Sequence, residues 1–205
     1  MSVERGTTAL LTRRREILSQ GAEAIGWKIG FNVPKIQEKL GIDRPLAGFL
    51  TSDSLIQDEW DEYPIVVESE VAVEIGGDGR SIVAMLPALE LADPPDLELG
   101  LEQILAGNIF HRAVAFGPRV ETREPGAGRI LVNGEEQHAL SAEQTVANLD
   151  AMVDVIAGRL ADAGEELQPG DRIITGVLAP PYEASEGDTV RLELDSLGSV
   201  ELRFS

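Results

Sequence analysis

The sequence contains no cysteine, which excludes disulfides, thiolate nucleophiles and cysteine-ligated zinc. It has only two histidines, His111 and His138, and this excludes a multi-histidine metal site. A bound metal would therefore depend on carboxylates, the ligands that hard cations such as Mg²⁺ and Mn²⁺ prefer. Taken alone, His111 is more typical of a hydrogen-bonded structural histidine, and His138 lies in a polar stretch that predicts an exposed turn.

Basic and aromatic residues are also scarce. The chain has 17 Lys and Arg against 36 Asp and Glu, a formal net charge of −19, and 4% aromatic residues. So acidic a surface repels phosphate backbones and anionic lipid head groups, so we expect neither nucleic acid nor a membrane as a partner. No apolar run approaches the ~18 residues of a membrane span, and residues 1–15 lack the apolar core of a signal peptide. We therefore expect a cytoplasmic protein.

Strand patterns outnumber helix patterns along the 205 residues, a length that suits one sizeable domain. We expect an N-terminal helical segment over residues 1–25 and a single catalytic domain over 26–205. Apolar spacing and end signals predict helices over 7–19, 34–40, 96–106 and 141–163. Apolar runs between turn residues predict strands over 27–29, 49–51, 65–75, 81–91, 112–116, 129–132, 172–175, 189–194 and 199–204. The strand-turn-strand stretches favour antiparallel or mixed sheets, which is an α+β class.

Two glutamates alternate on the strongest strand pattern, residues 65–75. Side chains two positions apart share a face of a strand, so Glu68 and Glu70 point the same way, with Cα atoms roughly 6.5–7 Å apart. Such a pair can bracket one cation. Alternating acids are also common on strands with one solvated face, and taken alone the pair favours that interpretation.

Glu90 lies in a mostly apolar stretch, where a carboxylate is costly to bury without a partner. A metal is one such partner, and Lys28 or Arg112 would be others. If the glycine-rich turn after the first strand brings the two strands together, Glu90 can join Glu68 and Glu70. Three carboxylates leave about three of six octahedral positions open for water and substrate. Lys28, if partly desolvated, would have a lowered pKa and could move protons, although a surface lysine is the simpler alternative.

Short motifs follow one another in a fixed order: GWKIG at 26–30, GIDRP at 41–45, VESE at 67–70, LPALE at 86–90, PGD at 169–171 and SLGSV at 196–200. Together they resemble the 2-keto-4-pentenoate hydratase and 4-oxalocrotonate decarboxylase branch of the fumarylacetoacetate hydrolase superfamily. The resemblance implies mixed β-sheets rolled around a central site, with flanking helices. It implies Mg²⁺ or Mn²⁺ on Glu68, Glu70 and Glu90, with Lys28 acting near the substrate. It also implies a pocket lined by the region of Asn108 and by Thr175, Gly176, Val177 and Leu178.

The activity that the resemblance implies is that of a metal-dependent lyase, a hydratase acting on a small 2-keto or 2-hydroxydienoic acid in the breakdown of aromatic compounds. A 2-keto acid chelates a cation through a carboxylate oxygen and its keto oxygen, and the cation stabilises the enolate. Decarboxylation shares that enolate, so a 2-keto acid decarboxylase, a tautomerase or a biosynthetic cyclase stays an alternative. From another class, the chain could be a non-catalytic ligand-binding partner subunit, because hydratase and decarboxylase subunits associate in this family. The family habit also implies a homodimer or a larger assembly.

The metal ligands that the resemblance implies follow the family pattern more closely than the residues expected around the substrate. Leu46 stands where many hydratase relatives carry an acid, and Phe110 stands where a small polar residue is common. Residues 177–180 replace a run that usually contains glycine or serine, and the segment before Lys28 is shorter than in most relatives. These differences predict an altered substrate pocket around a retained metal site.

Overall fold

The larger of two β-sheets forms the centre of the molecule. The computed structural model describes residues 2–146 and 149–205. In this part of the chain the larger sheet is seven-stranded, in the order β2-β1-β9-β4-β5-β6, with β10 beside β4. The β1–β9 pair is parallel, and the other pairs of this sheet are antiparallel. Its strands are β1 (Ala24–Gly30), β2 (Leu46–Thr51), β4 (Ile65–Ile75), β5 (Ile82–Ala92), β6 (His111–Phe116), β9 (Arg172–Val177) and β10 (Tyr182–Ala184).

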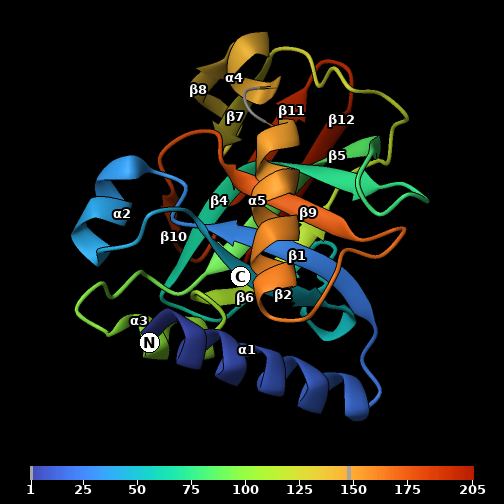
Figure 1. Ribbon diagram of the computed structural model, residues 1–205. Helices are drawn as coiled ribbons and strands as arrows, with labels where there is room; N and C mark the ends of the chain where they lie inside the picture. The colour runs from blue at the N-terminus through green and yellow to red at the C-terminus, as the bar shows by residue number, and fades with distance from the viewer. Residues whose placement is uncertain (1, 147–148) are drawn as a thin grey trace.

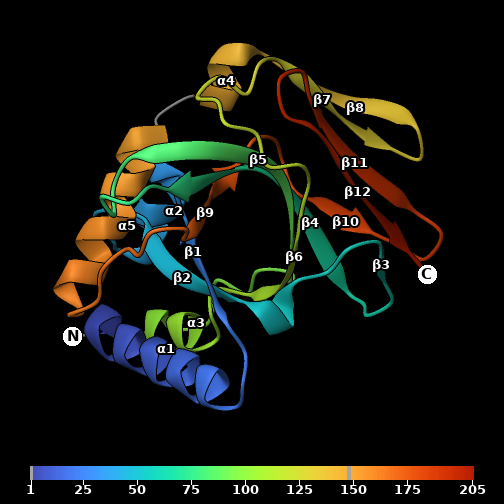
Figure 2. The same ribbon diagram turned by 90° about the vertical axis from the view of Figure 1, so that its right-hand side faces the viewer.

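A second, smaller sheet packs against β5 through β11 and β12. It has the order β3-β12-β11-β7-β8. Its strands are β3 (Glu59–Trp60), β7 (Gly128–Val132), β8 (Glu135–Leu140), β11 (Thr189–Leu194) and β12 (Gly198–Phe204). Figure 2 shows the long strands β4 and β5 curving strongly, with the smaller sheet at the opposite end of the molecule from α1 (Ser2–Ser19). The largest fully buried side chains are mostly Leu and Ile, in keeping with the low aromatic content.

Helices cover the outside of the larger sheet (Figure 1). The helix α5 (Leu149–Asp162) packs against β1, β2 and β9, and α1 packs against α3 (Leu101–Ala106) and β2. Two shorter helices are α2 (Pro34–Leu40) and α4 (Ala142–Val146), and a 3₁₀ turn, η1, covers Ser52–Ser54. Mixed sheets with flanking helices confirm the predicted α+β class. Among the described residues, no helix combines the length and the apolar character that a membrane span requires.

Some predicted element boundaries were wrong. The helix predicted over 96–106 begins only at Leu101, because the stretch after Pro94-Pro95 forms a turn. The helix predicted over 141–163 is described as α4 and α5, and residues 147–148 between them lie outside the described residues. Strand β8 was missed because Glu135–His138 is polar throughout, and His138 lies on this strand and not in a turn.

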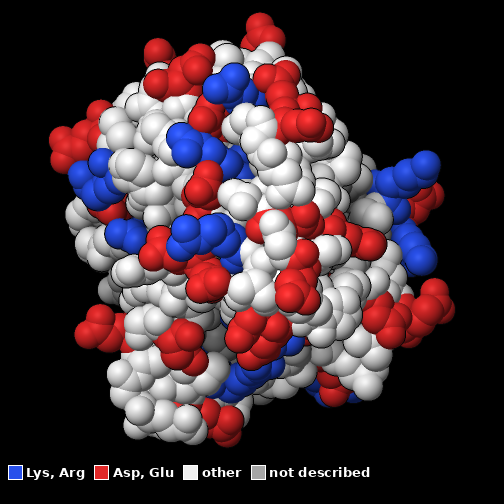
Figure 3. Space-filling model, turned by 180° about the vertical axis from the view of Figure 1, so that it is seen from behind, with Lys and Arg blue, Asp and Glu red and all other residues white. Residues whose placement is uncertain are grey.

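Acidic and basic side chains are interspersed on the surface. Figure 3 shows both signs side by side on the face opposite to that of Figure 1. Individual ion pairs follow this pattern, such as Arg129 Nε with Glu193 Oε2 at 2.7 Å and Arg80 Nη2 with Asp154 Oδ1 at 2.7 Å. Exposed pairs of this kind each contribute little to stability. The large negative charge is therefore spread over the surface and only partly balanced locally.

Candidate active site

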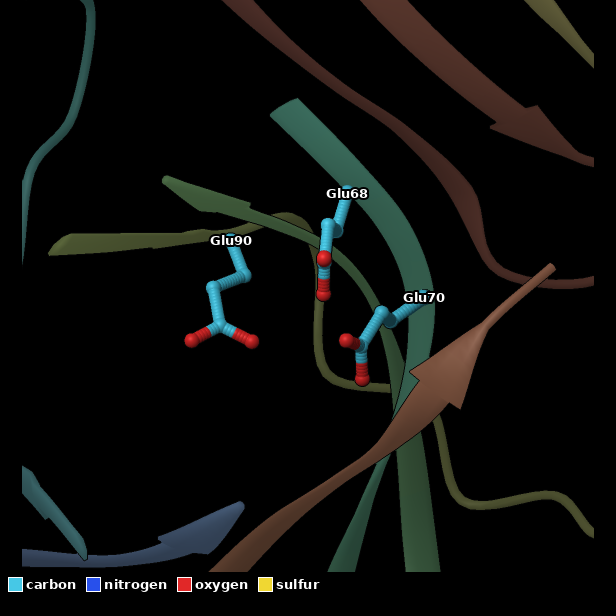
Figure 4. Close-up of side chains that lie close together, drawn as sticks. All are labelled: Glu68, Glu70 and Glu90. Atoms are coloured by element: carbon cyan, nitrogen blue, oxygen red, sulfur yellow. The ribbon is translucent and has the colours of Figure 1, made fainter. Parts of the chain in front are cut away.

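The β4–β5 hairpin brings three carboxylates together. Its register places Glu68 directly opposite Glu90, and Glu70 opposite Ala88. Glu68 and Glu70 share a face of β4, as their spacing predicts. One oxygen from each of Glu68, Glu70 and Glu90 lies within 4.8 Å of the others. Figure 4 shows the three side chains converging on one point from the two strands. The structure thus assembles the three residues that the sequence predicts as metal ligands.

Two buried oxygens of this cluster have no hydrogen-bond partner among the described residues. Glu70 and Glu90 are completely buried. Glu70 Oε2 accepts a hydrogen bond of 2.7 Å from the Gly176 N–H, and Glu90 Oε1 accepts from Lys28 Nζ. Within the described part of the chain, Glu70 Oε1 and Glu90 Oε2 have no such partner. Leaving a buried polar group unsatisfied costs about 1–3 kcal/mol, and more for a charged one. A hard divalent cation would satisfy both oxygens, so these residues fit a metal of the Mg²⁺ or Mn²⁺ type.

The electrostatics of the cluster lead to the same conclusion. Burial raises the pKa of Glu68 to about 7, with a further contribution from the charge on Glu90 and an opposing one from Lys28. Burial also raises the pKa of Glu70 well above its ordinary value, with contributions from the charges on Glu90 and Glu68. Without a cation, the cluster therefore resists carrying three negative charges at once. A divalent ion would reverse that preference.

Lys28 is a buried ammonium, and the predicted lowering of its pKa is wrong. Burial by itself would lower this pKa, but the carboxylates of Glu90, Glu68 and Glu70 outweigh it, and the pKa is raised. The alternative of a surface lysine is also wrong, because Lys28 is only 3% exposed. Conversely, burial would raise the pKa of Glu90, but Lys28 and a hydrogen bond from His111 lower it. Lys28 and Glu90 therefore form a buried ion pair.

Gly48 on β2 and the turn at residues 108–110 hold Lys28 in place. A Cβ at Gly48 on β2 would lie 2.7 Å from Lys28 Cγ and 2.8 Å from Asn108 Oδ1, so the stem of Lys28 needs glycine at this position. Lys28 Nζ also donates to the Ile109 carbonyl at 3.2 Å. The Asn108 amide accepts from the Phe49 N–H and donates to the Phe49 carbonyl, both at 2.9 Å. Asn108 therefore fixes the 108–110 loop to β2, and its amide is already paired.

A cleft of about 250 Å³ opens beside the glutamates, with Lys28 and Glu68 in its wall. Two of the residues predicted to bind substrate, Gly176 and Val177, line it. The other three, Asn108, Thr175 and Leu178, are not among its lining residues. Thr175 Oγ1 donates to the Val71 carbonyl at 2.8 Å, and the Leu178 N–H donates to the Ser69 carbonyl at 2.9 Å, so both stabilise the sheet. A larger groove of about 500 Å³ lies between α1 and α5, but the three-glutamate cluster does not border it.

The sequence did not reveal a group of strained residues beside the cleft. Asn108, Ile109 and Phe110 have φ values of 59°, 52° and 63°, and Phe31 has 58°. Positive φ is unusual for any residue but glycine, and for a β-branched or bulky residue it is an outlier. Such strain persists only where surrounding structure imposes it, and it concentrates at ligand sites. Of these residues, Phe31, Ile109 and Phe110 line the cleft.

Comparison with known proteins then gives the family. The model of the fumarylacetoacetate (FAA) hydrolase C-terminal family matches residues 44–205. The chain belongs to the fumarylacetoacetate hydrolase family. Its relatives in this family include 2-keto-4-pentenoate hydratase 1 of Dechloromonas aromatica, 27% identical over 93% of this chain and 81% of that protein. The TodF product hydratase of Pseudomonas putida F1 is 25% identical over 92% of this chain and 79% of that protein. A 4-oxalocrotonate decarboxylase of Pseudomonas putida is 24% identical over 95% of this chain and 81% of that protein.

Solved structures of the fumarylacetoacetate hydrolase type share the fold. The 4-oxalocrotonate decarboxylase of Pseudomonas putida G7, complexed with magnesium and adipate, has a TM-score of 0.82 at 21% identity, covering 96% of this chain and 83% of that one. Fumarylpyruvate hydrolase of Pseudomonas aeruginosa, in complex with Mn²⁺ and pyruvate, has a TM-score of 0.64 at 16% identity, covering 89% of each chain. These likenesses confirm the predicted fold, and the family match confirms the predicted resemblance.

Proposed function

We propose that this protein is a divalent-metal-dependent lyase, a hydratase that acts on a small 2-keto or 2-hydroxydienoic acid in the breakdown of aromatic compounds. The observation that carries the proposal is the pair of buried carboxylate oxygens, Glu70 Oε1 and Glu90 Oε2, that have no partner among the described residues. They belong to a three-glutamate cluster beside a cleft that Lys28 also lines. The names of the relatives, hydratases and decarboxylases of keto acids, support the same reaction class.

In this proposal Glu68, Glu70 and Glu90 hold the cation, Mg²⁺ or Mn²⁺. When bound, the cation would supply Lewis-acid stabilisation of the negative charge that develops at the 2-keto oxygen. The Gly176 N–H orients the carboxylate of Glu70. Lys28 and His111 both donate to Glu90 Oε1 and orient that carboxylate. Such outer partners fix the direction of metal ligands and raise the affinity of a site.

Lys28 is the proposed proton donor. Adding water across a carbon–carbon double bond conjugated with a keto group requires a proton at one carbon and a hydroxyl group at another. In the ion pair with Glu90, Lys28 is an ammonium and carries the proton that it would donate. Its side chain lines the cleft, so the ammonium lies next to where the carbon chain of a substrate would be held.

The test is an assay with 2-hydroxypenta-2,4-dienoate and Mg²⁺ or Mn²⁺. We expect loss of the diene absorbance without release of CO₂. Glu70→Gln should weaken Mn²⁺ binding in calorimetry by ~100-fold or more and abolish activity, since it removes a ligand whose position neighbouring groups have fixed. Glu74→Gln is the matched control, because Glu74 lies on the same strand but pairs with Arg119. It should retain both Mn²⁺ binding and activity. Equally poor Mn²⁺ binding by wild type and Glu70→Gln would show that the metal site is wrong.

A decarboxylase is the second candidate, because relatives at nearly the same identity carry that name. Incubation with 4-oxalocrotonate separates the two reactions. Release of CO₂ as the main activity would replace the hydratase proposal with the decarboxylase one, while the same three glutamates would keep their role.

We also propose that residues 26–205 form the catalytic domain and that the protein assembles as a homodimer or a larger oligomer. The family resemblance supports such an assembly. It also allows an assembly in which hydratase and decarboxylase subunits associate. Light scattering on the purified protein tests the oligomer, and a monomer at all accessible concentrations would contradict it.

A further inference from the structure

Asn32 has the only uncharged polar side chain among the described residues that line the cleft. The charged residues in this lining are Lys28, Glu68 and Asp93, and most of the others are apolar. Asn32 is half-buried, and a carboxamide beside apolar side chains is costly to desolvate unless a hydrogen-bond partner replaces the water that it loses. The position of this amide therefore needs a reason beyond packing.

The Asn32 carboxamide packs against the backbone of Gly176 at the end of β9. A Cβ at Gly176 would lie 2.2 Å from Asn32 Nδ2 and 2.8 Å from its Cγ, so the missing side chain leaves room for the amide. The N–H of the same glycine donates to Glu70 Oε2 at 2.7 Å. The amide thus lies beside the residue that orients one of the proposed metal ligands.

A strained turn holds Asn32 in this position. The preceding residue, Phe31, has a φ of 58°, and its carbonyl accepts a hydrogen bond of 2.8 Å from Gln37 Nε2. Positive φ in a bulky residue persists only where surrounding structure imposes it, and such strain concentrates at ligand sites. The Asn108 amide pairs with the backbone of Phe49, whereas no described residue forms a hydrogen bond with the Asn32 amide. The Asn32 amide is therefore free to bind a ligand.

The charged side chains of the cleft leave one role unfilled. A 2-keto acid that chelates a cation through its keto oxygen and one carboxylate oxygen still has a second carboxylate oxygen that needs a donor. The Lys28 ammonium has three donors, of which Glu90 and the Ile109 carbonyl take two, and the proposed proton transfer needs the third. Glu68 and Asp93 can only accept once they are ionised.

From these contacts we infer that Asn32 binds the substrate directly, an inference that rests on the proposed function. Its Nδ2 donates a hydrogen bond to the carboxylate oxygen that chelation leaves free. A hydrogen bond to a charged oxygen is stronger than one between neutral groups. It also fixes the rotation of the substrate about the cation, and so directs the carbon chain toward Lys28.

Calorimetry with pyruvate in the presence of Mn²⁺ tests the inference. Asn32→Leu keeps the approximate size of the side chain and removes the donor. We expect it to weaken pyruvate binding by at least ~10-fold, the effect of losing a hydrogen bond to a charged group. Its Mn²⁺ affinity without pyruvate should equal that of the wild type. Val33→Ala is the control, since this next residue of the cleft wall is 44% exposed and its side chain offers no donor, and it should change neither affinity.

A spectroscopic measurement on the wild type keeps the test independent of how well the variant folds. The side-chain amide signal of Asn32, assigned by its loss in Asn32→Leu, should shift in proton–nitrogen NMR when pyruvate is added with Mg²⁺. An unmoved signal, unchanged pyruvate affinity in Asn32→Leu, or an equal loss of Mn²⁺ affinity in that variant would each overturn the inference. Failure of the wild type to bind pyruvate at all would contradict the proposed function, and the inference with it.

Discussion

At the scale of single residues, His111 on β6 links the carboxylate of Glu90 to Ser54 in the 3₁₀ turn η1. Its Nδ1 lies 2.8 Å from Glu90 Oε1, and its Nε2 lies 3.1 Å from Ser54 Oγ. Because the carboxylate can only accept, Nδ1 carries the proton in this pair, and the Ser54 hydroxyl can donate to Nε2 when the ring is neutral. His111 thus fixes the direction in which Glu90 presents its other oxygen.

We predict that His111→Ala weakens Mn²⁺ binding by ~10–100-fold, as losses of such outer partners do. It should also lower the free energy of unfolding by about 1–3 kcal/mol, since a buried carboxylate loses one of its donors. Mn²⁺ titration and urea unfolding measure the two effects. His138→Ala, at the exposed histidine of β8, should change neither. Unchanged Mn²⁺ affinity in His111→Ala would limit His111 to a structural role.

The sequence predicted the three glutamates because strand periodicity and one glycine-rich turn determine their relative position. The exact pairing of Glu68 with Glu90 also depends on a register shift between Glu74 and Ile75, which the sequence did not reveal. The state of Lys28 could not be predicted in the same way. Burial alone suggests a lowered pKa, and only the assembled fold shows three carboxylates around its ammonium. The contact of His111 with Glu90 depends on the turn at residues 107–110, where Asn108, Ile109 and Phe110 have positive φ, and no sequence pattern predicts that conformation.

At the scale of elements, the end of β9 supports the site through Gly176. Its N–H donates to Glu70, and the β4–β9 register shifts between Glu70 and Ala72. Gly176 has a φ of 101°, and a Cβ there would lie 2.2 Å from Asn32 Nδ2. The bend of β9 that directs this N–H toward Glu70 therefore requires glycine.

We predict that Gly176→Ala lowers the free energy of unfolding by about 1–3 kcal/mol and weakens Mn²⁺ binding, because the strained backbone and the displaced Asn32 move the N–H away from Glu70. Gly187→Ala is the control: its φ is 91°, but a Cβ there meets nothing within 4 Å. Gly187→Ala should lower the free energy of unfolding without weakening Mn²⁺ binding. If the two variants bind Mn²⁺ equally well, the hydrogen bond from Gly176 does not support the metal site.

Elements with strong local signals were predicted with correct ends. Ile65–Ile75 and Pro34–Leu40 form β4 and α2 over the predicted residues, one because of its Val and Ile content and the other because Pro34 and Gly41 delimit it. The strands β8 and β10 were missed. β8 is an exposed edge strand of polar residues, and β10 has only three residues beside β4, so tertiary pairing and not local sequence decides both.

At the scale of the whole molecule, α1 belongs to the main hydrophobic core. Leu10 is 1% exposed and lies in the same cluster of buried side chains as Trp27. We predict that Leu10→Ala lowers the free energy of unfolding by about 2–5 kcal/mol, the range for emptying a buried leucine site. Leu99→Ala, at a leucine that is 37% exposed, should have little effect. Urea unfolding followed by tryptophan fluorescence and circular dichroism should show one transition, and an earlier separate transition would indicate that residues 1–25 unfold independently.

The acidic cluster also makes the stability of the whole protein depend on pH. Glu68 has a pKa of about 7 in the fold against an ordinary 4.5, and the pKa of Glu70 is raised as well. A raised carboxyl pKa means that the folded state binds the proton more tightly. The resulting stability is present below the unfolded pKa and is lost as pH rises through about 7.

A divalent cation should act in the opposite direction, because it binds the ionised carboxylates and below pH ~7 must first displace protons from them. We therefore predict that Mg²⁺ raises the Tm by a larger increment at about pH 8 than at about pH 5.5. Scanning calorimetry with and without Mg²⁺ at the two pH values measures the increments. In Glu68→Gln the metal-free protein should lose less stability between the two pH values than the wild type. Equal increments in the wild type would mean that Mg²⁺ does not bind at the glutamates whose pKa values are raised.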